Sequence, residues 1–250
     1  MIESAVHELP VYSKQMQPDE SVDAAAGAVF LIDKPMGWSS FRVVGLLRKL
    51  VGIKKVGHAG TLDPMATGLL ILCTGKATKQ IHLFQDAVKQ YYSEITFGGS
   101  TPSYDKETPI DNEADFKHIT RPQLEETIRT EFTGDIEQIP PMYAAIKHKG
   151  VPLYKIARKG GEVERKPRAV SIYKAEINAF ELPKLSVDIT CSKGTYIRSF
   201  AHDLGNALES KAHLSGLRRT AIGQYSVDQA LTVEQLIQNM DPHGKSGISL

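Results

Sequence analysis

A glycine-rich loop that carries an acid and a histidine is the part of the sequence best suited to chemistry. It runs Gly57-His-Ala-Gly-Thr-Leu-Asp-Pro-Met-Ala-Thr-Gly68. Glycine allows tight backbone paths and Pro64 keeps the preceding residue out of the helical region, so Asp63 is held on a stiff loop between apolar runs. Such a carboxylate can be a turn residue, a metal ligand or a catalytic group, and Asp-Pro alone is most typical of a turn. His58 can likewise be an ordinary hydrogen-bonding residue.

Two familiar kinds of site find no support in this region. Gly75-Lys76 is similar to the end of a phosphate-binding P-loop, but Leu70 stands where the first glycine is needed and Ala77 where Ser or Thr would hold Mg²⁺. His58 and Asp63 have no further ligands at a recognisable spacing, so the pattern does not indicate a metal centre. We therefore expect no nucleotide cofactor and no metal.

The elements that position these residues follow from periodicity and turn signals. Apolar or β-branched runs predict strands at Ala28–Asp33, Tyr91–Phe97, Ala169–Phe180 and Leu185–Cys191. Ser39 or Ser40 can cap a predicted helix that has Phe41, Val44, Leu47 and Leu50 on one face. Capping boxes at Thr120 and Thr232 predict the starts of two further helices, and a fourth helix is predicted over Tyr196–Leu208. Strands and helices do not alternate regularly, so we expect an α+β fold on a largely antiparallel sheet.

Length and composition bound the class of protein. The chain has 250 residues, of which 41% are hydrophobic and 24% charged, enough for one large domain with its own core. The longest apolar runs, Ala28–Ile32 and Leu69–Cys73, are too short to span a membrane. No secretory pattern is visible in Met1–Gly27, and Cys73 and Cys191 form no disulfide or zinc pattern. We expect a cytoplasmic protein.

The net charge of +1 is unevenly distributed. Phe41–Lys55 carries five basic residues and no acid, and Lys147–Arg168 carries eight basic residues against two acids. Ser103–Glu137 carries ten acids against four bases, and Met1–Gly27 five acids against one base. The two basic segments could form one phosphate-binding face, or they could be solvated surfaces on different sides of the molecule.

Five further segments accompany the Gly57–Gly68 loop in a characteristic order. They are Leu31-Ile-Asp-Lys-Pro-Met-Gly-Trp-Ser-Ser40, Lys89-Gln-Tyr-Tyr92, Gly134-Asp-Ile-Glu-Gln-Ile-Pro-Pro-Met-Tyr-Ala-Ala-Ile-Lys147, Cys191-Ser-Lys-Gly-Thr-Tyr-Ile-Arg198 and Leu217-Arg-Arg219. Together they resemble the signatures of the TruB family of tRNA pseudouridine synthases, over roughly residues 28–235. The resemblance implies the pseudouridine synthase fold and the isomerisation of uridine 55 in the tRNA T-loop, in which the N1–C1′ bond breaks, the uracil rotates and C5 bonds to C1′. This reaction needs no energy input and no cofactor.

The resemblance also assigns catalytic roles. Asp63 matches the family's catalytic aspartate, which can attack C1′, add to C6 of the base or take a proton from C2′. Arg198 matches the arginine whose guanidinium pairs with that carboxylate, and such a permanent cation keeps a buried acid ionised. Tyr91 matches the tyrosine that stacks on the uracil and moves a proton, although its neighbour Tyr92 is a possible alternative.

Substrate-binding roles follow from the same match. His58 corresponds to the histidine that fills the T-loop where the target base has left, and Lys34 to a support for Asp63. Tyr196 and Leu217 match residues that line the uracil pocket, and either can instead be ordinary core. Lys79 is expected to hold phosphate or the loop. The basic insertion at about 147–168 corresponds to the family segment that grips the RNA backbone, through Arg165, Lys166 and Arg168.

The resemblance and the segment compositions also predict the domain organisation and the partner. We expect a flexible N-terminal arm over 1–27, a catalytic domain over 28–240 and a polar tail over 241–250, without the C-terminal PUA-type RNA-binding domain of many bacterial relatives. The partner is expected to be the tRNA T-stem-loop, bound by a monomer without guide RNA and away from membranes. The alternative function is a tRNA-binding folding factor whose main role is non-catalytic.

Overall fold

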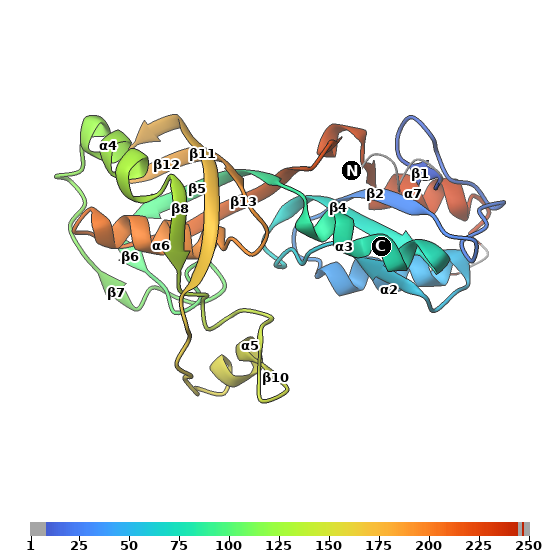
Figure 1. Cartoon of the computed structure of the whole chain (residues 1–250), viewed down its shortest axis with the longest axis horizontal. Helices are drawn as coiled ribbons and strands as arrows, with labels where there is room; N and C mark the ends of the chain where they lie inside the picture. Colours follow the sequence, from blue (N-terminus) through green and yellow to red (C-terminus); the bar gives the residue numbers. More distant parts are fainter. Residues whose placement is uncertain (1–8, 245–246, 248–250) are drawn as a thin grey trace. The chain divides into compact units, whose positions relative to one another are not determined.

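The computed structural model of the chain describes residues 9–244 and 247 (Figure 1). The chain forms two compact units, one made of 1–89 with 218–250 and the other of 90–217. The sequence predicts one catalytic domain over 28–240. In the structure, residues 218–240 of that range belong to the same unit as residues 28–89. This arrangement pairs segments distant in sequence, which local patterns do not report.

Unit 1 is built on a mixed sheet. Its strands are β1 (Val11–Tyr12), β2 (Val29–Lys34), β3 (Val56–His58), β4 (Thr67–Thr74), the end of β13 (Ala212–Ile222), β14 (Tyr225–Ser226) and β15 (Leu231–Thr232). Its helices are α2 (Ser40–Val51), α3 (Ile81–Asp86) and α7 (Val233–Met240), with short 3-10 turns at η1 (Gly75–Gln80) and η2 (Val227–Gln229). The order β1-β2-β4-β13 combines an antiparallel β2–β4 pair with parallel pairs at either side.

The central strands of unit 1 are buried on both faces. Alternate residues of a strand point to opposite sides. Phe30 and Ile32 of β2 join a core that contains residues of α2 and α7, whereas Val29 and Leu31 join a second core that contains Phe84 of α3. Continuous apolar runs in β2 and β4 are therefore what a sheet covered by helices on both sides requires.

The N-terminal segment differs from the predicted flexible arm where the structure describes it. Val11 and Tyr12 form β1, which pairs in parallel with Val29 and Phe30 of β2. The Tyr12 ring lies 5.0 Å from the Phe30 ring, centre to centre. A two-residue strand is too short to give a periodic signal, so the sequence pattern could not reveal this attachment. Residues 1–8 lie outside the described part, as does half of the predicted tail over 241–250.

Unit 2 packs two helices on a sheet. Its strands are β5 (Lys89–Phe97), β6 (Gly99–Ser100), β7 (Asn112–Glu113), β8 (Gly134–Gln138), β9 (Lys147–His148), β10 (Val151–Pro152), β11 (Arg168–Glu181), β12 (Lys184–Cys191) and the start of β13. Its helices are α4 (Arg121–Glu131), α5 (Leu153–Ala157) and α6 (Ile197–Ala207). The large sheet has the order β13-β5-β12-β11-β8.

One face of this sheet forms the core of unit 2. Ile95, Val187 and Ile189 from the strands pack with Leu124 of α4 and Phe200 of α6. The outward residues of β11 are exposed, as expected for an antiparallel sheet with one covered face. The helix α6 is anchored most deeply, since its residues 197–201 are all buried.

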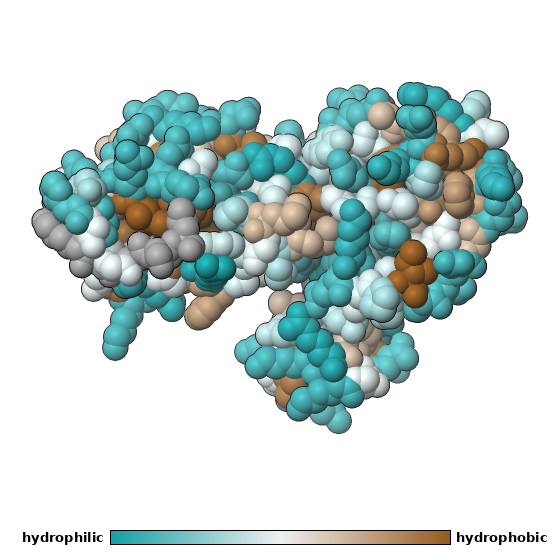
Figure 2. Space-filling model, turned by 180° about the vertical axis from the view of Figure 1, so that it is seen from behind, coloured by the Kyte–Doolittle hydropathy of each residue, from teal (hydrophilic) through white to brown (hydrophobic). Residues whose placement is uncertain are grey.

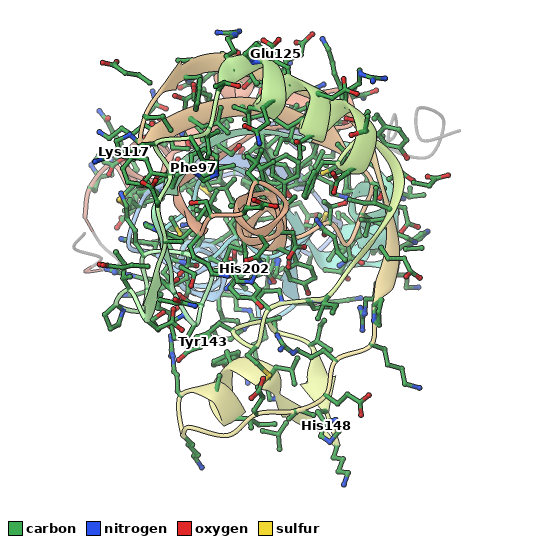
Figure 3. All side chains as sticks on the ribbon, turned by 90° about the vertical axis from the view of Figure 1, so that its left-hand side faces the viewer. Phe97, Lys117, Glu125, Tyr143, His148 and His202 are labelled. Carbon is green, nitrogen blue, oxygen red and sulfur yellow. The ribbon has the colours of Figure 1, made fainter. Side chains whose placement is uncertain are left out.

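The segment that connects β8 to β11 forms a small lobe of unit 2. It contains β9, β10 and α5, and hydrophilic residues cover most of it in the view of Figure 2. Figure 3 shows Tyr143 where the lobe joins the body of the unit and His148 within the lobe. An exposed pair between Arg158 and Glu107 connects α5 to the loop before β7.

Most predicted elements are confirmed, with two corrections. All four predicted strands and four predicted helices are present, and the capping box at Thr232 forms. Thr120 precedes α4 without a side-chain cap, so the predicted capping box is wrong there. Phe41 is 67% exposed, not on the buried face of α2, because Val43, Val44 and Leu47 face the core instead. Among the described residues, no helix has the length and apolar character needed to cross a bilayer.

Candidate active site

Asp63 lies, half-buried, in the loop that joins β3 to β4 in unit 1. The Leu62 N–H donates to Ser40 Oγ at 2.8 Å, and Ser40 Oγ donates back to the Leu62 carbonyl at 3.0 Å. The Gly37 N–H donates to the Pro64 carbonyl at 2.7 Å. The residues on both sides of Asp63 are thus fixed by the turn after β2 and by the first residue of α2.

A fully buried lysine lies close to this loop. Lys34 is the last residue of β2, and its ammonium donates to the carbonyls of Pro35 at 2.9 Å and Trp38 at 2.7 Å. Burial lowers the pKa of the Lys34 ammonium to about 8, while the Asp63 carboxylate acts in the opposite direction. The Asp63 carboxylate therefore favours the charged form of Lys34, and the support role of Lys34 for Asp63 stays a prediction.

A second buried cation holds the backbone of the same loop. Arg219, 1% exposed, donates from Nε to the Leu69 carbonyl at 2.8 Å and from a terminal nitrogen to the Gly60 carbonyl at 3.2 Å. Gly68 has a φ of +104°, and a Cβ there would lie 2.3 Å from the Arg219 carbonyl oxygen. Glycine is therefore required for β4 and β13 to approach each other where the loop ends.

His58 and Lys79 occupy different environments. His58 ends β3 and is half-buried, and within the described structure its Nδ1 is buried without a hydrogen-bond partner. Burial lowers the pKa of the His58 imidazole, so the ring is neutral near pH 7. Lys79 lies in η1 with its side chain exposed, where it can meet a phosphate.

Arg198 is the central cation of unit 2. It stands in the first turn of α6, is 4% exposed, and donates to the carbonyls of Ser103 at 3.3 Å and Tyr143 at 3.0 Å. One terminal nitrogen lies 3.7 Å from Oδ2 of Asp105, which is also buried. The electrostatic attraction between Arg198 and Asp105 is strong because water does not screen charges that are buried this deeply.

A polar loop between β6 and β7 holds Asp105 in place. Ser103 Oγ donates to Asp105 Oδ1 at 2.6 Å, and the Glu107 N–H donates to the same oxygen at 2.8 Å. Asp105 Oδ2 accepts no hydrogen bond from the described residues, so this oxygen interacts with Arg198 through charge alone. The loop therefore fixes the carboxylate that faces the guanidinium.

The residue before α6 is held by a buried amide. The Tyr196 N–H donates to Gln138 Oε1 at 3.0 Å, and Gln138 Nε2 donates to the Tyr196 carbonyl at 3.3 Å. Ser199 Oγ donates to the Ile139 carbonyl at 2.8 Å. The end of β8 thus sets the position of both Tyr196 and Arg198.

Tyr91 and Tyr92 are neighbours on β5 and so point to opposite faces of the sheet. Tyr91 is half-buried and packs against the core of unit 2, and Leu217 packs against the same core. Tyr92 Oη lies 3.5 Å from a carboxylate oxygen of the exposed Glu94. The placement of Leu217 agrees with the core alternative for this residue as well as with a pocket.

The three basic residues expected to meet RNA differ in exposure. Lys166 and Arg168 are exposed, whereas the Arg165 side chain is only 17% exposed and donates to the Pro140 carbonyl at 3.1 Å. Arg165 also lies 3.6 Å from Glu162. Arg165 therefore connects the two ends of the lobe, and Lys166 and Arg168 are the two that present their charges to solvent.

The structure brings Lys34 and Asp63 together in unit 1, and Tyr196 and Arg198 together at the start of α6 in unit 2. Sequence reasoning missed Asp105, Gln138 and Arg219 as parts of these networks. Asp105 lies in a segment with ten acids, so nothing in the sequence distinguishes it. Within 9–244 and 247, the structure has no group of three or more His, Cys, Asp or Glu side chains that could hold a metal ion.

Comparison with known proteins decides the family. The family model described as the TruB family pseudouridylate synthase N-terminal domain matches residues 48–197. The chain belongs to the TruB family. A second model, the tRNA pseudouridylate synthase B C-terminal domain, matches residues 198–245. The boundary between the two matches falls at the start of α6.

Individual relatives agree with this assignment. The chain is 48% identical over 221 residues to a tRNA pseudouridine synthase B of Bacteroides fragilis, covering 86% of this chain and 94% of that protein. It is 47% identical over 225 residues to the protein of the same name from Flavobacterium johnsoniae, covering 87% and 96%. Among solved structures, a Cbf5–Nop10–Gar1 complex matches with a TM-score of 0.69 and 27% identity over 95% of this chain. This chain spans 61% of the length of that matched chain. The TruB assignment and the pseudouridine synthase fold predicted from the sequence are thus confirmed.

Proposed function

We propose that this protein isomerises uridine 55 in the T-loop of tRNA to pseudouridine. Its TruB family membership and its relatives named tRNA pseudouridine synthase B support pseudouridine formation in tRNA. The observation that carries the proposal is the Asp63 carboxylate on a loop fixed at Leu62 and Pro64, beside the buried Lys34 cation. A carboxylate kept ionised at a fixed place is what all three chemical routes require.

In the proposed reaction Asp63, Tyr91 and Arg198 act on one nucleotide. Asp63 either bonds to the nucleotide or removes a proton from C2′ while the N1–C1′ bond breaks. The uracil then turns and C5 bonds to C1′. The proton on C5 leaves while N1, now separated from C1′, gains one, and Asp63 gives back the bond or proton that it took up, so that substrate and product are isomers. In the roles that the family resemblance gives them, Tyr91 stacks on the base and moves this proton, and the Arg198 guanidinium stabilises the Asp63 carboxylate.

The target base must leave the T-loop stack before it can reach Asp63. Extruding a base costs a few kcal/mol, and a ring that fills the vacancy offsets part of this cost. We assign that role to His58, whose neutral ring can enter a stack without bringing a charge with it. Tyr196 and Leu217 line the pocket for the extruded uracil, and Lys79, Lys166 and Arg168 contact phosphates.

The proposed partner is the T-stem-loop of tRNA, bound by a cytoplasmic monomer without guide RNA. The identity is 47–48% to proteins named tRNA pseudouridine synthase B and 27% to the matched chain of the Cbf5–Nop10–Gar1 complex, which favours a stand-alone enzyme. The alternative of a mainly non-catalytic folding factor is not favoured, because these relatives are named for pseudouridine formation.

The proposal is tested with purified protein and a T-stem-loop minihelix, with no other protein or RNA present. Pseudouridine is then located by carbodiimide labelling and primer extension. We expect modification at position 55, and none in a matched minihelix with cytidine at that position. Modification elsewhere in the loop, or only after a guide RNA is added, would contradict the proposed substrate.

A further inference from the structure

A group of aromatic and basic side chains, exposed except for the half-buried Trp38, extends from the turn before α2 to the last turn of that helix in unit 1, outside the roles assigned above. We call Met36, Trp38, Phe41, Arg42 and Lys49 the α2 surface. Met36 is 68% exposed and Phe41 67% exposed, the two largest exposed fractions among the large apolar residues of the described chain. Single exposed apolar residues are common on protein surfaces. The side chains around Met36 and Phe41 therefore decide whether these two residues belong to a binding surface.

The neighbours are cations arranged over aromatic rings. The Arg42 guanidinium lies 3.7 Å from the centre of the Trp38 ring, which is stacking distance. The Arg48 guanidinium lies 5.6 Å from the centre of the Phe41 ring and donates to the Val56 carbonyl at 2.9 Å. Stacking on an indole orients a guanidinium and leaves the N–H donors at its edge available for an acceptor.

No acid balances these cations within the same segment. Phe41–Lys55 contains five Lys or Arg and no Asp or Glu. In the described structure no ion pair involves Arg42 or Lys49, whereas Arg121 and Arg129 of α4 each pair with a glutamate of their own helix. A patch of uncompensated positive charge attracts phosphate, and the exposed Phe41 ring beside it offers a face to an unpaired base.

The α2 surface adjoins the catalytic loop within the same unit. Gly37, between Met36 and Trp38, donates to the Pro64 carbonyl, and Ser40, next to Phe41, exchanges two hydrogen bonds with Leu62. Leu62 and Pro64 are the residues on either side of Asp63. A nucleotide bound at the α2 surface would therefore lie near the one whose base is extruded.

We propose that the α2 surface is an RNA-binding site for nucleotides next to the target uridine, with Phe41 stacking on an unpaired base and Arg42 and Lys49 contacting phosphates. The inference rests on the proposed function, since RNA is then the substrate. The α2 surface is then a second RNA contact, besides the basic lobe of unit 2. Its two kinds of contact can be told apart by how their loss changes Kd and the salt dependence of Kd. Loss of stacking weakens binding at every salt concentration, whereas loss of a phosphate contact also lowers the salt dependence.

The test measures binding of a fluorescently labelled T-stem-loop RNA by anisotropy over a range of KCl concentrations. For Phe41→Ala we expect Kd to rise about fivefold or more with an unchanged slope of log Kd against log salt. For Arg42→Ala we expect a higher Kd and a slope smaller by roughly 0.7–0.9. Phe41→Leu, which keeps an apolar side chain without a ring, should behave like Phe41→Ala.

Two matched controls remove the same groups elsewhere. Tyr173→Ala removes another exposed ring, and Lys184→Ala removes another exposed positive charge, and both should bind like the wild type. Wild-type affinity and slope in both Phe41→Ala and Arg42→Ala, with pseudouridine still formed by the wild type, would overturn the α2 surface and leave the proposed function intact. Failure of the wild type to bind or modify the RNA would instead overturn the proposed function.

Discussion

At the scale of residues, two buried cations of the protein are held by backbone carbonyls. Lys34 and Arg198 each donate to two carbonyls, so their positions are set by the chain's path and not by a flexible partner. Each also has a carboxylate nearby, Asp63 for Lys34 and Asp105 for Arg198. Fixed charges of this kind stabilise charge that develops in a reaction without reorganising.

Replacing Arg198 by methionine should reduce turnover far more than binding. The change removes a buried guanidinium and leaves the Asp105 carboxylate without its cation. We expect the single-turnover rate of pseudouridine formation to fall by about 100-fold or more, while Kd for the T-stem-loop changes by less than about threefold.

Arg129→Met provides the control for this change. Arg129 is exposed and pairs only with Glu126 on the surface of α4, so rate and affinity should stay at wild-type values. A wild-type rate in Arg198→Met would show that this guanidinium has no part in the chemistry.

The residue scale also shows the limits of sequence reasoning. Asp63, His58 and Lys34 stand in short, distinctive motifs, so they could be proposed as site residues from spacing and resemblance. Asp105 and Gln138 could not, because their roles arise from contacts with α6 across about 90 and 60 residues of sequence. Such pairings depend on how strands are ordered, which local composition does not encode.

At the scale of elements, the junction of β4 and β13 positions the loop that carries Asp63. Gly68 is where the two strands come closest, and its φ of +104° is a conformation that other residues rarely adopt. Gly68→Ala should lower the free energy of unfolding by roughly 3 kcal/mol, since strain and a clash with the Arg219 backbone add together. Urea unfolding measures this loss.

The matched control for Gly68→Ala is Gly52→Ala. Gly52 also has a positive φ, of +68°, but a Cβ there meets nothing within 4 Å. Its cost should be near 1 kcal/mol, from backbone strain alone. An equal loss in the free energy of unfolding for the two variants would show that the close approach of Arg219 to Gly68 adds nothing to the cost of Gly68→Ala.

A half-buried acid on α6 gives the stability of the protein a specific pH dependence. Burial raises the pKa of the Asp203 carboxyl to about 6, from an ordinary value of 3.8. Between pH 4 and 6 the folded state keeps a proton that the unfolded state releases, so Asp203 makes the protein less stable as the pH rises through this window. Asp203→Asn should therefore stabilise the protein by about 1–2 kcal/mol at pH 7.5 and have little effect at pH 3.5.

Unfolding curves of the wild type and Asp203→Asn at several pH values measure this difference. A constant difference across pH 3.5–7.5 would contradict the assigned titration. Asp188→Asn, an exposed acid on β12, serves as the control and should change stability little at either end of the range.

Elements themselves were the easiest part of the fold to predict. The buried runs of β2 and the regular spacing of Phe200 and Leu204 in α6 indicate their structure directly. The prediction for Phe41 was wrong because a helix can present one large apolar residue to solvent without losing its buried face. The strand β13 was not predicted, since Arg218 and Arg219 are rarely expected inside a buried sheet.

At the scale of the whole molecule, charge distribution relates the protein to its polyanionic substrate. The acidic segment 103–137 and the basic segment 147–168 both belong to unit 2. The basic residues on the lobe attract RNA, and the acids of the neighbouring segment repel it, so RNA should bind unit 2 through the lobe. The near-neutral net charge hides this arrangement, and only the segment charges reveal it.

Neutralising the two exposed cations at the end of the lobe tests this distribution. For Lys166→Ala combined with Arg168→Ala, we expect weaker tRNA binding and a salt slope lower by roughly 0.7–0.9 for each lost contact. Arg165→Ala should mainly lower the melting temperature, because Arg165 holds the Pro140 carbonyl. Lys117→Ala, in the acidic segment, should leave affinity and slope unchanged, and an unchanged slope in the double variant would refute the lobe as an RNA contact.

The central claim is that Asp63 performs the chemistry, and the most direct test compares the wild type with Asp63→Asn on the same tRNA. Asparagine has the size of aspartate but no negative charge, and the hydrogen bonds at Leu62 and Pro64 do not involve the Asp63 side chain. Mass spectrometry of tRNA fragments after chemical labelling should show pseudouridine at position 55 with the wild type and none with Asp63→Asn, while both proteins bind the tRNA with similar Kd. Pseudouridine formation by Asp63→Asn at the wild-type rate would contradict the account.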